Sequence, residues 1–381
     1  GQEFQANSFT TSDQANAAVA MDLAGNFVVT WESTNQDGNG YGIYAQRYTA
    51  DGEALGSEFQ VNTYTSNNQF GADVAMDGDG DFVITWQSSG QDGSSYGVYA
   101  RHYGSDGQAL DSEFRVNTST SSFQRFPAVA MDGDGDFVIT WESYHEGTGL
   151  GVYAQRFASD GQAQGSELHV NTTLTGQQSY PDVAIDGDGD FVITWQSESQ
   201  DGSQYNIFAQ RYTSAGLAQG SEFRVNSYTT EHQSSPEVAL DGDGDFVIVW
   251  TSNNQDSDSP DIFAQRFAST GGFLGSEFRV NSYTTQQQFN PAVAMDSSGD
   301  FVVSWQSYDQ DGPYDNGIYA QRFTATGQAE GSEFQVNTYT SNGQSVPALA
   351  VDSQGGFAVF WHSAQDGAGN GIFGRRFQLT D

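Results

Sequence analysis

The sequence predicts an all-β protein made of seven copies of one unit. Three observations predict this fold: tryptophan recurs every 54 to 56 residues, each unit contains four short β-like runs, and no segment shows sustained helical periodicity. The only tryptophans in the chain are Trp31, Trp86, Trp141, Trp195, Trp250, Trp305 and Trp361. Self-similarity at this period indicates one supersecondary unit copied many times, so we interpret the chain unit by unit.

The fifth unit shows the four runs clearly, at residues 236–240, 245–250, 261–267 and 276–281. They are rich in Val, Ile and Phe and are bounded by Gly, Asp, Asn and Ser, as strands are. The first two runs are joined by Asp-x-x-Gly in every unit, for example from Asp77 to Gly80. This spacing predicts a tight hairpin with glycine in the left-handed region. All neighbouring runs can therefore pair antiparallel.

Four antiparallel strands in each of seven units predict a seven-bladed β-propeller that spans residues 1–381 as one domain. The second run is apolar on both faces, which suits a blade packed between two others. A linear β-solenoid is the alternative, although its coils are usually about half this length. The chain begins with a fourth-type run at residues 3–7 and ends after a third-type run at 371–377. We therefore expect the N-terminal strand to complete the last blade and close the ring.

The composition is strongly acidic, with 12 basic residues against 49 acidic ones and a net charge of −37. This charge excludes nucleic acid and anionic membrane surfaces as partners and favours divalent cations. No apolar run is long enough to insert in a membrane, and the chain has no cysteine. We expect a protein located outside the cell or on its surface, as a monomer or as part of a larger chain.

Four of the hairpins carry the sequence Asp-Gly-Asp-Gly-Asp, in which alternate carboxylates share a short loop. Such a loop offers the oxygen ligands that calcium prefers, and acidic turns without metal are the alternative. We expect calcium as the cofactor, with these candidate ligands: Asp77, Asp79, Asp81, Asp132, Asp134, Asp136, Asp186, Asp188, Asp190, Asp241, Asp243 and Asp245.

These hairpins resemble the calcium loops of EF-hands and of FG-GAP propeller repeats, and also the Asp-box hairpin of sialidase-type propellers. The Ser-x-Asp-x-Gly-x-Thr-Trp order of the Asp box is not met, and the later bidentate carboxylate of a calcium loop is missing. The whole repeat, with its Glu-Phe-x-Val-Asn and Tyr-Ala-Gln-Arg-Phe phrases, resembles arrays in large secreted surface proteins of bacteria. This resemblance implies secretion and an adhesive role at a surface.

Two further sets of polar residues recur and are candidates for binding a ligand. One is a glutamine just before each innermost strand, which either faces a ligand or caps loop backbone: Gln14, Gln69, Gln124, Gln178, Gln233, Gln288 and Gln344. The other lies in the loop after the tryptophan: Asp37, Asp92, Asp201, Asp311 and Asp366. With the nearby Tyr41, Tyr96, Tyr205 and Tyr314, these aspartates could hold sugars by stacking and hydrogen bonds.

Catalysis usually breaks the symmetry of a repeat, because one site needs a unique set of groups. The five histidines fall at unrelated positions, and no catalytic constellation stands out. We therefore expect no enzyme and no catalytic residue, but a secreted adhesion module that binds glycans or other cell-surface polymers. A structural spacer in a larger surface protein is one alternative. The other is a carbohydrate-active enzyme with a carboxylate pair hidden among the many acidic residues.

Overall fold

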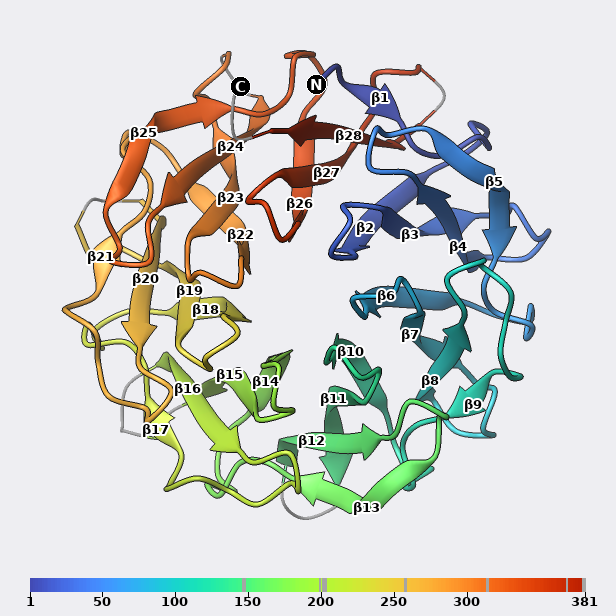
Figure 1. Cartoon of the computed structure of the whole chain (residues 1–381), viewed down its shortest axis with the longest axis horizontal. Helices are drawn as coiled ribbons and strands as arrows, with labels where there is room; N and C mark the ends of the chain where they lie inside the picture. Colours follow the sequence, from blue (N-terminus) through green and yellow to red (C-terminus); the bar gives the residue numbers. More distant parts are fainter. Residues whose placement is uncertain are drawn as a thin grey trace.

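The computed structural model describes residues 1–145, 149–198, 200, 204–256, 259–312, 315–367 and 369–378. Its strands form seven four-stranded antiparallel sheets, arranged as blades around a central axis (Figure 1). The predicted seven-bladed propeller is confirmed. The described residues form no helix, and so none that could cross a membrane.

The first four blades follow the chain in order. Blade 1 consists of β2 (Gln14–Met21), β3 (Phe27–Thr34), β4 (Tyr41–Tyr48) and β5 (Ala54–Gln60). Blade 2 consists of β6 (Gln69–Met76), β7 (Phe82–Ser89), β8 (Tyr96–Tyr103) and β9 (Phe114–Arg115). Blade 3 consists of β10 (Gln124–Met131), β11 (Phe137–His145), β12 (Gly149–Phe157) and β13 (Ala163–His169). Blade 4 consists of β14 (Gln178–Ile185), β15 (Phe191–Glu198), β16 (Tyr205–Tyr212) and β17 (Phe223–Arg224).

The last three blades complete the ring. Blade 5 consists of β18 (Gln233–Leu240), β19 (Phe246–Ser252), β20 (Asp261–Phe267) and β21 (Phe278–Arg279). Blade 6 consists of β22 (Gln288–Met295), β23 (Phe301–Tyr308), β24 (Asn316–Phe323) and β25 (Ala329–Gln335). Blade 7 consists of β26 (Gln344–Val351), β27 (Phe357–Ser363), β28 (Gly371–Phe377) and the N-terminal β1 (Phe4–Gln5).

The first strand of each blade lies nearest the axis, and first strands of neighbouring blades contact one another around the ring (Figure 1). The glutamine of each unit opens this strand, and the Asp-x-x-Gly hairpin follows its end. These two ends lie on opposite sides of the ring. We call them the strand-start face and the hairpin face.

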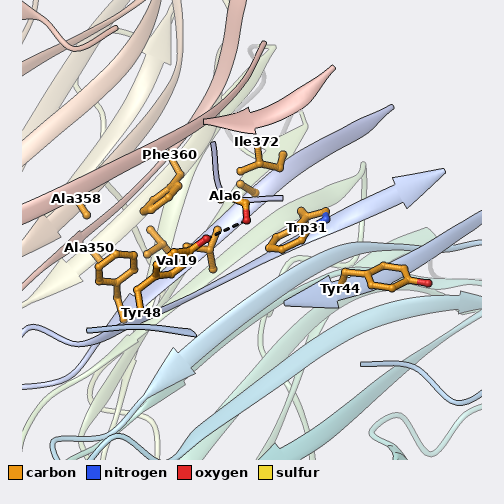
Figure 2. Packing of buried hydrophobic residues seen from close by; sticks show 12 residues of the cluster. Ala6, Val19, Trp31, Tyr44, Tyr48, Ala350, Ala358, Phe360 and Ile372 are labelled. Carbon is orange, nitrogen blue, oxygen red and sulfur yellow. Dashed lines mark hydrogen bonds between the residues drawn. The ribbon is translucent and has the colours of Figure 1, made fainter. Parts of the chain in front are cut away.

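The core consists of seven clusters of buried side chains, one at each contact between neighbouring blades. Second strands contribute to the clusters on both sides. Trp31 packs toward blade 7 (Figure 2), whereas Val28, on the same strand, packs toward blade 2. Burial on both faces explains why second strands are apolar without alternation. All seven tryptophans are no more than 1% exposed.

Closure of the ring follows the prediction, because β1 pairs antiparallel with β28 and places Phe4 opposite Gly374. The first and last strands of the chain therefore lie side by side (Figure 1). The segment after β1 is also held by blade 1, since the Tyr48 hydroxyl donates a hydrogen bond to the Ala6 carbonyl at 2.9 Å (Figure 2). The first residues of the chain thus join blade 7 to blade 1.

Candidate functional site

A β-bulge interrupts the first strand of every blade near the strand-start face. The third residue of this strand, which we call the bulge residue, has a φ between 51° and 63° in all seven blades, in the left-handed region. The bulge residues are Asn16, Gly71, Phe126, Tyr180, Ser235, Asn290 and Val346. Bulges concentrate at sheet edges and beside functional sites, where they re-aim side chains. Left-handed backbone is costly for Phe, Tyr and especially Val, so the neighbouring blades must stabilise it.

In five of the blades the preceding blade provides that stabilisation through a hydrogen bond to the N–H of the bulge residue. The acceptor is the side chain just after the tryptophan of the preceding blade. Glu32 accepts from Gly71 at 2.7 Å, Gln87 from Phe126 at 2.7 Å and Glu142 from Tyr180 at 3.2 Å. Gln196 and Gln306 accept in the same way from Ser235 and Val346. Burial raises the pKa of both Glu32 and Glu142.

Two residues after the bulge residue, the repeat symmetry breaks. Four blades have alanine at this position: Ala18, Ala128, Ala292 and Ala348. The other three have a partly exposed carboxylate beside the axis, Asp73 on β6, Asp182 on β14 and Glu237 on β18. Asp73 Oδ2 accepts the Val129 N–H at 2.8 Å, and Asp182 Oδ2 accepts the Val238 N–H at 2.7 Å. We call these three residues the axial carboxylates.

The axial carboxylates have strongly perturbed acidity. Desolvation raises the pKa of Asp73 to about 6, although hydrogen bonds from Val129 and Val74 oppose the rise. Desolvation and then the charge on Asp73 raise the pKa of Asp182 to about 7. The pKa of Glu237 lies well above its ordinary value because of burial and the charges on Asp182 and Asp73. With pKa values of about 6 and about 7, Asp73 and Asp182 titrate close to neutral pH, which favours acid–base chemistry.

A second departure from symmetry lies on the same side of the ring, on blades 3 and 4. The Phe126 and Tyr180 rings stack with centroids 4.7 Å apart. Arg125 forms an ion pair with the buried Glu142 at 2.5 Å, and its guanidinium lies 5.1 Å from the Phe126 centroid. Phe123 lies on another side of this guanidinium, at 4.4 Å. Aromatic rings, one cation and a buried carboxylate thus meet around Tyr180, which precedes Asp182 by two residues on β14.

The predicted glutamine ring is fully buried, at 0% exposure for all seven members. Their amides bind the loops and the core instead of solvent. Gln233 Oε1 accepts the Trp250 indole N–H at 3.0 Å, and Gln14 Oε1 accepts from Asn7 at 2.9 Å. The Gln14 amide nitrogen donates to the Ser12 carbonyl. These contacts are those of the backbone-capping alternative, and a ligand at the surface would not reach the side chains.

Three of the described aspartates in the loops after the tryptophans bind the outer strand of their own blade, and Asp92 binds its own loop. Asp311 Oδ2 accepts from Gln335 at 2.7 Å and from Asn337 at 3.2 Å. Asp366 and Asp37 similarly accept from Gln5 and Gln60. Asp92 accepts the Ser94 N–H at 2.9 Å. Asp201 and Tyr314, expected with them, lie outside the described residues.

The acidic hairpins use most of their carboxylates as structural acceptors. The first aspartate closes its own turn, as Asp77 Oδ1 does by accepting the N–H groups of Asp79 and Asp81 at 2.9 Å. The third reaches the next hairpin of its blade, as Asp81 does by accepting the Ser105 N–H at 2.7 Å. Among the described residues, no three acidic or histidine side chains are grouped as metal ligands would be.

Cavities on the hairpin face recur where blades meet. One of about 300 Å³ lies between blades 6 and 7, and one of about 320 Å³ lies between blades 4 and 5. Each is lined by hairpin aspartates and by a third-strand arginine, Arg322 in the first and Arg211 in the second. Because equivalent residues line both, these cavities belong to the repeated architecture.

Sequence reasoning missed the axial carboxylates, although the signal for them is present. When the seven units are aligned, three acidic residues interrupt a column of alanines. The sequence analysis instead selected residues that recur in most units, such as the glutamines. Repetition in this chain indicates architecture, and the departures from it indicate the site.

No protein family and no curated protein matches the sequence. Solved structures match the fold. The polysaccharide lyase Uly1 is similar over 95% of this chain and 89% of its own, with a TM-score of 0.56 and 11% identity. The α-L-arabinofuranosidase of Fusarium graminearum is similar over 99% and 97%, at 0.55 and 13%. The β-propeller domain of the Trilobed protease from Pyrococcus furiosus is similar over 98% and 97%, at 0.55 and 9%.

These comparisons contradict the expectation that the chain is not an enzyme. A polysaccharide lyase, a microbial sialidase and an arabinofuranosidase share the propeller fold over most of this chain. The expectation rested on an unbroken symmetry, but Asp73, Asp182 and Glu237 break that symmetry at the axis. At identities of 11 to 13% the likeness shows the fold alone, so any activity must be argued from the residues of this site.

Proposed function

We propose that this chain is a carbohydrate-active enzyme that hydrolyses a glycosidic bond at the ring axis. The observation that carries the proposal is the set of axial carboxylates, which replace alanine in three of seven otherwise equivalent positions. Their charges interact, and their pKa values are raised to different extents. Paired carboxyl groups with separated pKa values are the usual machinery of glycoside hydrolysis.

The perturbed acidities assign the roles. Glu237 is assigned as the proton donor, because desolvation and two neighbouring carboxylates raise its pKa well above the ordinary value. It transfers its proton to the glycosidic oxygen as the bond from that oxygen to the anomeric carbon breaks. Asp73, with a pKa of about 6, is mostly ionised at neutral pH and accepts a proton from the attacking water. The pKa of Glu237 is raised first by desolvation and then by the charges on Asp182 and Asp73.

Neighbouring structures support a carbohydrate substrate in a general way, since several are named for action on carbohydrates. Three proposals come from the sequence alone. They are location outside the cell, a monomeric state or membership of a larger chain, and calcium at the hairpins. The acidic composition without cysteine supports the location. None of these proposals is needed for the chemistry at the axis.

The test is to incubate the protein with a panel of polysaccharides and measure new reducing ends. We expect Glu237→Gln and Asp73→Asn to reduce the rate by about 100-fold or more, as the loss of acid–base groups does. Asp182→Asn should reduce the rate less, through the pKa of Glu237. Asp188→Asn is the matched control, because Asp188 is exposed on the hairpin face of the same unit as Asp182. If no glycan is cleaved, or if the axial variants cleave as fast as the control, the proposal is wrong.

A further inference from the structure

We infer that the site takes an uncharged glycan, and that Phe126 and Tyr180 form the platform on which one sugar ring stacks. The inference rests on the proposed function, because it places the ligand beside the same axial carboxylates. It adds the class of substrate and the residues that recognise it. Two independent observations support it: the exposure and position of the platform, and the distribution of positive charge.

The platform combines exposed aromatic surface with an unusual backbone. Tyr180 is 47% exposed, although it lies on an innermost strand, and it stacks on the partly buried Phe126. Both residues adopt φ of 51°, which the bulges impose. Tyr180 precedes Asp182 by two residues on β14. Aromatic faces beside polar groups are well suited to the apolar faces of sugar rings.

The other bulge residues do not offer such a surface. Blades 1, 2, 5, 6 and 7 have Asn16, Gly71, Ser235, Asn290 and Val346 at this position. Phe126 and Tyr180 are the two aromatic members, and they are neighbours in the ring. The same strand, β14, therefore carries half of the platform and one of the axial carboxylates. A sugar stacked on Tyr180 would lie beside the strand that carries Asp182.

The distribution of arginine excludes an acidic glycan. The chain has no lysine, and eleven of its twelve arginines lie on third or fourth strands, away from the axis. Many of these bind the next blade, as Arg211 does through the Thr270 carbonyl at 2.7 Å. A uronate, sialate or sulfate at the axis would meet Asp73, Asp182 and Glu237 within a protein of net charge −37. Like charges at close range disfavour such binding.

Arg125 is the one arginine on an innermost strand, and its charge is already balanced. It pairs with Glu142, which is 0% exposed, and it lies against Phe123 and Phe126. It therefore has no spare charge for a ligand carboxylate. A cationic sugar on the platform would in turn approach this guanidinium. An uncharged glycan avoids both conflicts.

The experiment measures binding apart from turnover. Neutral polysaccharides such as arabinan, xylan, galactan and mannan, and acidic ones such as polygalacturonate, alginate and sulfated galactan, are titrated against the Glu237→Gln protein. Chitosan serves as the cationic comparison. We expect affinity for at least one neutral glycan, reduced roughly 10-fold by adding Tyr180→Ala, since aromatic stacking contributes on that order. Val346→Ala, at the equivalent bulge of blade 7, should leave the affinity unchanged.

Three results would overturn the inference: binding confined to acidic glycans, tighter Tyr180-dependent binding of chitosan, or neutral binding that Tyr180→Ala leaves intact. Absence of binding to every neutral glycan tested would overturn it as well. Turnover by the unmodified protein is measured on the same panel. Tyr180-dependent neutral binding without turnover would refute the proposed hydrolysis while leaving the platform in place.

Discussion

The hairpin face and the axis of this propeller are built from the same repeat but differ in symmetry. On the hairpin face, every unit repeats one turn: the Asp Oδ1 accepts two N–H groups, and glycine adopts a φ between 76° and 90°. At the axis, the position two residues after the bulge residue is alanine in some blades and a carboxylate in others. Repeated polar residues stabilise the ring, whereas the residues that differ among blades carry unequal acidity and exposed aromatic surface. This comparison predicts opposite consequences for substitutions in the two classes.

The largest effect should come from a repeated core residue. Trp250 is fully buried at the contact between blades 4 and 5, so Trp250→Ala leaves a large cavity. We expect the free energy of unfolding to fall by about 3–5 kcal/mol, measured by denaturant titration. Phe273→Ala in the same unit is the control, because Phe273 is 60% exposed and should cost less than about 1 kcal/mol. Equal losses for the two variants would contradict the assignment of the tryptophans to the core.

The repeated glutamines should come next. Gln233→Ala removes the acceptor of the Trp250 indole N–H and the donor to the Glu231 carbonyl, and it leaves buried polar groups unsatisfied. We expect a loss of about 2–3 kcal/mol in the same measurement.

Gln162→Ala, at an exposed glutamine of blade 3, should change the stability very little and serves as the comparison. A Gln233→Ala protein with unchanged stability and weakened glycan binding would instead return the glutamine ring to the list of ligand contacts.

An axial carboxylate should behave in the opposite way. The pKa of Asp182 is raised to about 7 in the folded protein, so the folded state binds more protons than the unfolded chain between about pH 4 and pH 7. Its contribution to stability is therefore present at low pH and is lost as the pH rises through 7. Asp182→Asn removes this loss and keeps an acceptor for the Val238 N–H.

We expect Asp182→Asn to raise the free energy of unfolding by roughly 1–2 kcal/mol at pH 8, with a smaller gain at pH 5. Thermal melts at the two pH values measure the difference, and Asp188→Asn, on the hairpin face, should show no such dependence. A variant that is destabilised at pH 8 would mean that Asp182 is a structural acceptor like the hairpin aspartates. If Asp182→Asn gains stability and loses activity, the axial carboxylates serve function, whereas the repeated hairpin aspartates serve stability.

The fold could be predicted almost completely from the sequence, but the site could not. Trp31 and its six equivalents define the unit, and the fourth-type run at the N-terminus predicts the closure by β1. The bulges were not predictable, because Phe126, Tyr180 and Val346 are not residues that favour left-handed backbone. Their conformation depends on acceptors in another blade, such as Glu142 for Tyr180. Without the bulges, nothing shows which side chains flank the axis.

The repeated glutamines show how one sequence pattern can indicate either a ligand site or a backbone cap. In the sequence, a polar residue repeated in seven units near the predicted mouth of a ring resembles a binding site. In three dimensions each one is enclosed by loops whose backbone groups need a partner, as the Ser12 carbonyl does at Gln14. The axial carboxylates interrupt the alanine column of the aligned units, but their position beside the axis is needed to distinguish them in function from the other acidic residues.

The smallest effect should come from divalent cations at the acidic hairpins, where the sequence predicts calcium. Asp241 Oδ1 already accepts the N–H groups of Asp243 and Asp245, and Asp245 accepts the Ser269 N–H at 2.8 Å. We therefore expect calcium and magnesium to stabilise the protein equally, through screening of the net charge. The free energy of unfolding should rise by about 0.5 kcal/mol or less, and thermal melts would show a correspondingly small shift. Sodium chloride of matched ionic strength is the control. A larger rise with calcium alone, abolished by chelator and reduced in Asp243→Asn, would instead establish the predicted metal sites, because a ligand stabilises the state to which it binds. The hairpin face would then have a function of its own, and repetition would no longer separate architecture from function in this ring.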